Sequence, residues 1–137
     1  MIKKISFFVL MMCFVFFSSC AKENAKGEFK HYKAIADALN KQCPTKIGDD
    51  IQLDAVEYIE STHTLQYVYS FTTMAKEDNT AEAWNLIEAA TKEALSTEFK
   101  SQTNVEQFRK DKLNMSFVYR DKNMESLFTV ILKPEEY

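Results

Sequence analysis

The sequence predicts an α+β fold in which two amphipathic helices pack on one face of a four-stranded antiparallel sheet. Apolar residues recur at three- and four-residue spacing over residues 28–42 and 79–100, which is the period of a helix buried on one side. Apolar and polar residues alternate over 65–73, 113–120 and 126–132, which is the period of a strand. The order helix-hairpin-helix-hairpin predicts one sheet covered by both helices.

The first half of the chain predicts one helix and one hairpin. Pro44 ends the helix, because the residue before a proline avoids the helical region. Residues 51–60 predict a strand whose alternation breaks near Ala55, which indicates a bulge. Residues 61–64 form a turn that leads into the strand 65–73. The apolar positions of the helix are Phe29, Tyr32, Ile35, Ala36 and Leu39.

The second helix is predicted to begin at Asn79 or Thr80, with Glu82 completing a capping-box-like start. A short helical turn is expected over 104–110. The side chains expected to form the buried stripe of the long helix are Trp84, Leu86, Ile87, Ala90, Ala94, Leu95 and Phe99.

The second hairpin is predicted to turn at residues 121–123, with Asn123 in the left-handed conformation. Residues 126–132 are apolar on both faces, so this strand is expected inside the sheet. Pro134 ends it.

Composition favours a single small domain and argues against a nucleic-acid partner. The chain has 137 residues and a formal net charge of −3, and removing Lys3 and Lys4 would leave it more acidic. An acidic surface of mixed sign also gives little electrostatic attraction to anionic lipid.

Residues 1–19 have the pattern of an export signal. Lys3 and Lys4 precede an apolar run from Ile5 to Phe17, and the small residues Ser18 and Ser19 follow. The run is shorter than the roughly 20 residues that span a bilayer as a helix. We therefore expect this segment to be removed from the exported protein.

The segment Phe17-Ser18-Ser19-Cys20 resembles the lipobox of bacterial lipoproteins. The resemblance implies cleavage before Cys20, lipid attachment to its thiol, and acyl chains (palmitate among them) as the membrane anchor. Ala21 after the cysteine, where some lipoproteins have Asp, favours the outer membrane by the same resemblance. The alternative is an ordinary secretory peptide cut near Ser19, with Cys20 a free thiol.

These boundaries predict three parts: a signal peptide over 1–19, a lipidated tether over 20–27, and one α+β domain over 28–137. In this arrangement Cys43 is the only unmodified cysteine of the mature chain, so no internal disulfide can form. We interpret Cys43 as a small buried apolar side chain, with a reactive thiol or an intermolecular disulfide as the alternatives.

The residues give no sign of catalytic, metal-binding or cofactor chemistry. His31 and His63 are the only histidines, they lie far from metal-ligand spacing, and both are expected at the surface. The mature chain has only Gly27 and Gly48, so it lacks a glycine-rich phosphate loop. We therefore expect a protein that is not an enzyme and holds neither cofactor nor metal.

Two surfaces are candidates for binding. If helices cover one sheet face, the other face presents an apolar patch for an envelope protein or a second copy. The first hypothesis is accordingly an envelope-assembly or protein-interaction lipoprotein. The alternative is a small-ligand binder with an aromatic pocket between sheet and helices. The partner face would comprise Val68, Val118, Leu127 and Ile131, and the pocket would be lined by Tyr67, Tyr69, Trp84 and Tyr119.

Overall fold

The computed structural model describes residues 25–137, with side chains from Phe29 onward. The predicted signal peptide, Cys20 and the segment before Ala25 lie outside the described residues. The elements in chain order are α2 (Ala25–Asn40), β1 (Thr45–Lys46), β2 (Ile51–Ile59), η1 (Glu60–Thr62), β3 (Thr64–Phe71), η2 (Lys76–Asp78), α3 (Ala81–Ser101), α4 (Glu106–Lys110), β4 (Asn114–Arg120), β5 (Ser126–Leu132) and η3 (Pro134–Glu136).

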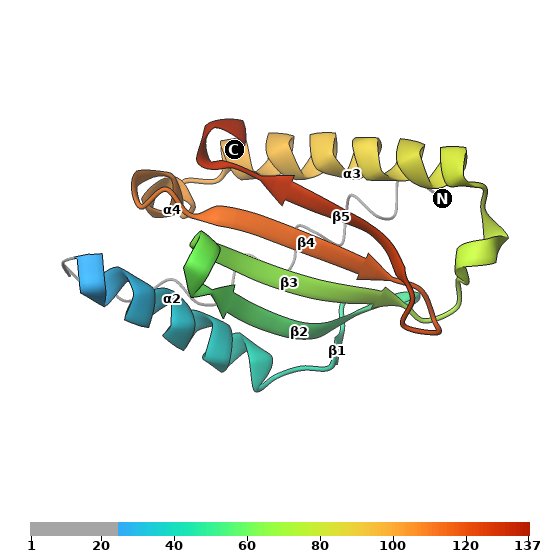
Figure 1. Cartoon of the computed structure of the whole chain (residues 1–137), viewed down its shortest axis with the longest axis horizontal. Helices are drawn as coiled ribbons and strands as arrows, with labels where there is room; N and C mark the ends of the chain where they lie inside the picture. The colour runs from blue at the N-terminus through green and yellow to red at the C-terminus, as the bar shows by residue number, and fades with distance from the viewer. Residues whose placement is uncertain (1–24) are drawn as a thin grey trace.

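The sheet has five strands in the order β1-β2-β3-β4-β5, and β3 and β4 run parallel (Figure 1). The α+β class predicted from the sequence is correct, but the four-stranded antiparallel sheet is wrong. The 21-residue helix α3 is the cause, because it carries the chain from the end of β3 back to the end where β3 began. A crossover of this kind joins parallel strands, whereas two hairpins placed side by side would pair antiparallel.

The fifth strand is β1, which follows the cis Cys43–Pro44 peptide bond and pairs with the outer edge of β2. With only two residues, it has no alternation that a sequence pattern could reveal. The bulge predicted in β2 is confirmed, because the register with β3 shifts between Leu53 and Ala55. Asn40 at the end of α2 accepts the backbone N–H of Val56 through its side chain at 3.1 Å, close to this bulge.

Both long helices pack against the same face of the sheet, at its two edges. On α2, the ring of Tyr32 lies 6.0 Å from that of Tyr58 in β2. On α3, the ring of Trp84 lies 6.3 Å from that of Phe128 in β5. Tyr58 and Phe128 belong to the core-facing side of their strands, so this face is the core face. Figure 1 looks onto the opposite face, across which none of the helices in residues 25–137 passes.

The core lies between this face and the helices. Its most deeply buried side chains include Tyr32, Leu53, Leu65, Leu95, Phe99, Leu113, Met115, Tyr119, Val130 and Leu132. Trp84, Leu95 and Phe99 are buried as predicted. Leu86 is 72% exposed, because it lies on the side of α3 that faces away from the sheet. The buried stripe of α3 is therefore narrower than predicted and does not include Leu86.

Helix α3 begins at the second of the two predicted positions, and the capping-box-like role predicted for Glu82 is wrong because Ala83 occupies the third helical position. Thr80 is the N-cap, and its hydroxyl accepts the backbone N–H of Ala83 at 3.2 Å. Such a bond satisfies one of the otherwise unpaired donors of the first turn. The hairpin turn between β4 and β5 differs from the prediction, since Met124 and not Asn123 has a positive φ, of 67°.

Candidate functional site

The outer face of the sheet brings together three of the four residues predicted to form the partner face. Val68 pairs with Val118 across the parallel strands, and Val118 pairs with Thr129 of β5. Ile131 lies one row further along and is 50% exposed. Val118 is half-buried, and Val68 is buried. This face therefore presents Val118, Thr129 and Ile131 to the surroundings.

Leu127 is placed differently from the other three. The register between β4 and β5 shifts between Tyr119 and Arg120, opposite this part of β5. Leu127 is half-buried and packs against the core cluster. The irregular pairing thus turns a residue of the expected patch towards the interior.

The predicted aromatic pocket residues are buried and pack against other rings. The rings of Tyr69 and Tyr119 stack at 5.2 Å, and those of Tyr67 and Tyr69 at 6.4 Å. Burial raises the pKa of the Tyr119 hydroxyl. These three tyrosines form one stacked row on the core face of β3 and β4.

Trp84 lies outside this row. The ring of Phe128 stands between them, 4.7 Å from the ring of Tyr119 and 6.3 Å from that of Trp84. The indole N–H of Trp84 donates to the backbone carbonyl of Lys76 at 2.8 Å, so its polar group is satisfied by the protein. The ring of Phe128 therefore separates Trp84 from the row of tyrosines.

The position of His63 differs from the exposed turn position that the sequence predicts. The residue is half-buried with a positive φ of 48°. Its Nδ1 lies 2.6 Å from the hydroxyl of Tyr58, and its Nε2 lies 2.8 Å from the backbone carbonyl of Asp111. With Nε2 protonated, the imidazole donates to that carbonyl and accepts from Tyr58.

Tyr32 extends this cluster to the first helix. Its side chain is fully buried, and its hydroxyl donates to the Asp111 carboxylate at 2.5 Å. The rings of Phe29 and Tyr32 both approach the His63 ring edge-on, at 5.4 and 5.6 Å. The cluster thus fastens the start of α2 to the β2–β3 turn and to the end of α4. Its members are scattered along the sequence, so no local pattern could have revealed it.

Cys43 has the surroundings of a structural thiol. It is half-buried, and its thiol donates to the carbonyl of Leu39 at 3.4 Å. Burial, and secondly the negative charge of Asp54, raise the pKa of this thiol. A raised pKa lowers the fraction of reactive thiolate. This agrees with the interpretation of Cys43 as a small packed side chain.

Two features are absent from the part of the chain that the structure describes. Residues 25–137 contain no group of three or more His, Cys, Asp or Glu side chains that could hold a metal ion. None of the helices in this part of the chain is long and apolar enough to cross a membrane.

Comparison with solved structures shows the same fold in three bacterial proteins. The first, a protein from Pseudomonas aeruginosa described as secreted, is 16% identical with a TM-score of 0.65, and the match covers 85% of this chain and 98% of that one. The second is the type II secretion system pilotin AspS from Vibrio cholerae, 11% identical with a TM-score of 0.55, covering 82% and 94% of the two chains. The third is the type II secretion system pilotin EpsS from Vibrio vulnificus, 7% identical with a TM-score of 0.58, covering 81% and 92%.

A comparison with curated proteins found no match. The profile of one family, described as a domain of unknown function, matches residues 26–128. This range runs from the first turn of α2 into β5, so it takes in both long helices and most of the sheet. The chain therefore belongs to the family DUF8479.

Proposed function

We propose that residues 20–137 form a lipid-anchored protein of the bacterial envelope that binds another envelope protein and helps to assemble a membrane complex. In this proposal the protein is not an enzyme. Its anchor is the acylated Cys20, and the outer membrane is the expected location. The partner would dock on the outer face of the sheet.

The observation that carries the proposal is the fold shared with two secretion-system pilotins. The match covers 94% and 92% of the pilotin chains, so their architecture is present here almost entirely. A fold by itself does not assign a function. The lipobox-like segment Phe17-Ser18-Ser19-Cys20 supports the lipid anchor independently, because this resemblance does not depend on the fold.

The outer sheet face is the docking surface that the geometry supports best. Val118 and Thr129 form a cross-strand pair in its centre, and Ile131 is half exposed beside them. An apolar side chain of this size gains about 1.5–3 kcal/mol when it passes from full exposure to full burial. Burial of Val118 and Ile131 by a partner would therefore contribute usefully to binding.

The alternative of a small-ligand pocket has less support. Tyr69, Tyr119 and Phe128 stack on one another, and the N–H of Trp84 already has a backbone acceptor. A polar ligand would have to replace contacts that these side chains make with each other.

The first experiment is the intact mass of the protein extracted from membranes of a bacterium that expresses the full chain. A chain that begins at Cys20 and carries the mass of acyl chains supports the proposal. An unmodified chain cut near Ser19 contradicts it. In parallel, Cys20→Ala should move the protein from the membrane to the soluble fraction, while Cys43→Ser, which changes the other cysteine, should leave it on the membrane.

The second experiment tests the docking face. A photo-crosslinking residue is introduced at Ile131 and, as a control, at Asn85, which is exposed on the far side of α3. We expect a discrete crosslinked product with the probe at Ile131 alone. In a chain without the probe, the substitution Ile131→Lys should abolish co-purification of the partner that the crosslink identifies. Equal crosslinking at both positions would count against this face.

A further inference from the structure

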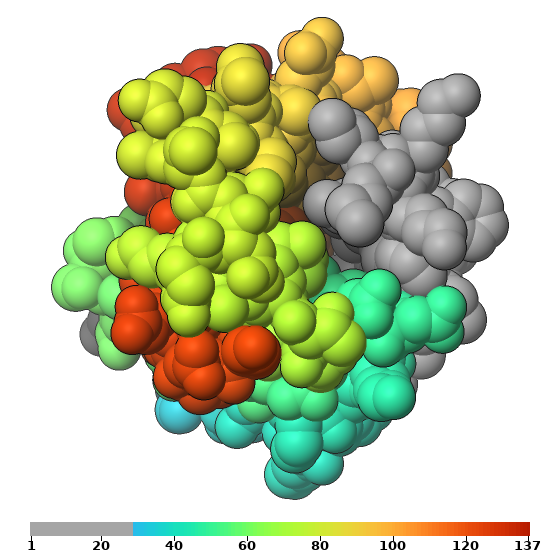
Figure 2. Space-filling model, turned by 90° about the vertical axis from the view of Figure 1, so that its right-hand side faces the viewer, coloured from blue at the N-terminus to red at the C-terminus, as the bar shows by residue number. Residues whose placement is uncertain are grey.

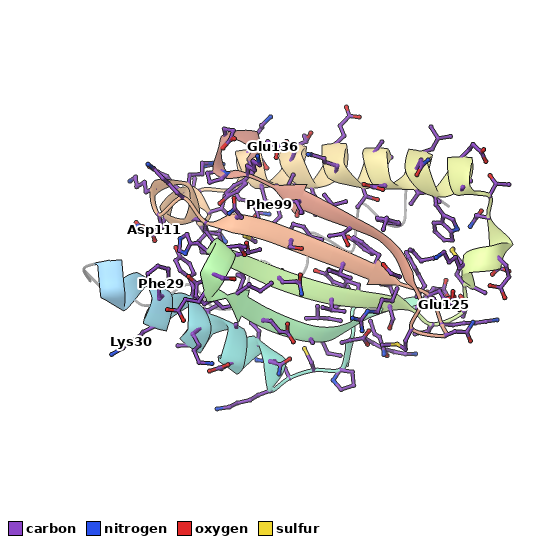
Figure 3. All side chains as sticks on the ribbon, viewed as in Figure 1. Phe29, Lys30, Phe99, Asp111, Glu125 and Glu136 are labelled. Atoms are coloured by element: carbon purple, nitrogen blue, oxygen red, sulfur yellow. The ribbon has the colours of Figure 1, made fainter. Side chains whose placement is uncertain are left out.

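The charged side chains are distributed unevenly between the two ends of the sheet. At the end where α2 begins, four cations (Lys30, Arg109, Lys110 and Lys112) lie near three acids (Glu60, Glu106 and Asp111). Lys30 and Lys112 are exposed and have no ion pair among the described residues, while Lys110 pairs with Glu106 at 3.0 Å. Figure 3 labels Lys30 at this end and Glu125 at the opposite one. The net negative charge of the chain is therefore not spread evenly along its long axis.

The opposite end is rich in acidic side chains. Figure 2 looks onto this end, where the β4–β5 loop (orange-red) lies against the segment that follows β3 (yellow-green). Lys46 of β1 and the loop residues Lys76 and Lys122 also lie at this end but are fewer than the acids. The exposed acidic residues are Asp49, Asp50, Glu77, Asp78 and Glu125.

The start of α2 is held rigidly on the basic end. Phe29 packs edge-on against His63 at 5.4 Å, and Tyr32 reaches both Phe108 at 5.7 Å between rings and the Asp111 carboxylate at 2.5 Å. These contacts fix the first described turns of α2 to η1 and α4. The point at which the preceding chain joins the domain is thereby fixed as well.

The chain between the anchor and this helix is short. Cys20 precedes Ala25 by five residues, and at most about 3.5 Å per residue this allows roughly 18 Å. The domain is longer, because α3 alone has 21 residues and is about 31 Å long at 1.5 Å per residue. An anchor at Cys20 therefore cannot bring the acidic end to the membrane as easily as the basic end.

We propose that the end formed by the start of α2, η1 and α4 rests on the phospholipid headgroups, with Lys30 and Lys112 contacting their phosphates. The loop 121–125 then points away from the membrane. This inference deepens the proposed function and rests on its lipid anchor at Cys20. It names the surface that faces the bilayer and leaves the outer sheet face open for a protein partner.

The backbone at Lys112 provides a second observation. Lys112 follows α4 with a φ of 55°, and the N–H of Leu113 donates to the carbonyl of Phe108 at 3.0 Å. This is the helix ending at which glycine is usual, because a side chain disfavours a positive φ. The chain therefore has an exposed cation at a position whose backbone conformation favours glycine. The variant Lys112→Gly therefore removes the charge without harming the fold.

The test uses the acylated protein in nanodiscs of phosphatidylethanolamine and phosphatidylglycerol that contain a gadolinium-chelating lipid. Paramagnetic broadening of backbone amide signals reports the distance of each residue from the headgroups. We expect broadening over 60–62 and 106–112 to be at least five times that over 121–125. Equal broadening at both ends, or stronger broadening over 121–125, would overturn the orientation.

Matched variants test the contact with phosphate. The double variant Lys30→Gln/Lys112→Gly should lose most of the difference between anionic discs and discs of phosphatidylcholine. The control Lys76→Gln/Lys122→Gln removes the same charge from the far end and should change nothing. A double variant that behaves as the parent protein would overturn the phosphate contact.

Failure of the anchor and failure of the orientation are distinguishable. If the mass shows no acyl chains, the proposed function fails, and Cys20 of the mature Cys43→Ser chain is then coupled to a maleimide phospholipid in the same discs. The broadening pattern of this coupled protein supports or overturns the orientation in the same way.

Discussion

The carboxylate of Asp121 joins two loops distant in the sequence, because it accepts the backbone N–H of Lys76 at 2.9 Å. Asp121 is fully buried, and its other oxygen accepts the N–H groups of Asn123 at 2.8 Å and Glu125 at 2.9 Å. Burial alone would raise the pKa of this carboxyl, but the three backbone hydrogen bonds outweigh it and hold the pKa below its usual value. One side chain thus organises the β4–β5 loop and the approach to α3.

We expect Asp121 to stabilise the fold at neutral pH and to lose that contribution in acid. Its pKa is lower in the folded than in the unfolded chain, so stability is present above the unfolded value of about 4 and falls as the pH drops towards the folded value. Asp121→Asn should lower Tm at pH 7 and flatten the loss of Tm below about pH 4. Thermal unfolding followed by circular dichroism from pH 7 to 3 measures both effects.

The control for this prediction is Glu125→Gln. Glu125 lies in the same loop, but its side chain is exposed and only its backbone contacts Asp121. Its Tm should follow that of the parent protein at every pH. If both variants shift Tm equally, the effect comes from loop charge in general.

Tyr32→Phe should loosen the start of α2 without unfolding the sheet. It removes the hydroxyl that donates to Asp111 and retains the ring packed against Phe108. A hydrogen bond to a charged group contributes roughly 1.5–3 kcal/mol, and water can partly replace this one because Asp111 is half-buried. We expect a loss of about 1 kcal/mol in urea unfolding and faster amide exchange confined to α2.

Lys33→Ala provides the comparison on the same helix. Its ion pair with Asp37 at 3.6 Å is exposed, and such pairs contribute only about 0.3–0.5 kcal/mol. Equal effects of the two substitutions on α2 would show that the Tyr32 hydroxyl has no special part in holding the helix.

Two leucines on α3 test whether the stability cost of a Leu→Ala substitution follows the burial of the side chain. Leu95 is fully buried, whereas Leu86 is 72% exposed. Leu95→Ala should cost about 2–5 kcal/mol, because it removes core contacts and leaves a cavity. Leu86→Ala should change stability by less than about 0.5 kcal/mol. Chemical denaturation of both variants measures the difference, and a similar cost for both would contradict the placement of α3.

Periodicity identified the long helices and four strands, because each buries a regular stripe or face. It could not identify the parallel pairing of β3 and β4, since the relative direction of these strands depends on where α3 returns the chain. It also missed β1, whose pairing of Thr45 with Leu53 involves too few residues to form a pattern. Local patterns therefore predicted elements well and their arrangement poorly.

The candidate sites show the same division. Alternation placed Val118 and Ile131 on one face correctly, but the irregular register between β4 and β5 altered the position of Leu127. The contact of His63 with Asp111 and that of Asp121 with Lys76 join residues 48 and 45 positions apart, and no spacing in the sequence indicates them.

Met124 shows how Asp121 decides which loop residue takes the left-handed conformation. The N–H of Met124 donates to the Asp121 carbonyl at 3.0 Å, and the carboxylate takes the N–H groups on either side. This arrangement puts the positive φ of 67° on Met124, which is 50% exposed. The left-handed region costs a residue with a Cβ about 1–2 kcal/mol, whereas glycine adopts it freely. Met124→Gly should therefore raise the free energy of unfolding by about 0.5–1 kcal/mol in urea titrations, while Met124→Ala, which keeps the Cβ, should not. A gain with alanine alone would mean that the exposed side chain, and not the backbone, limits stability at this turn.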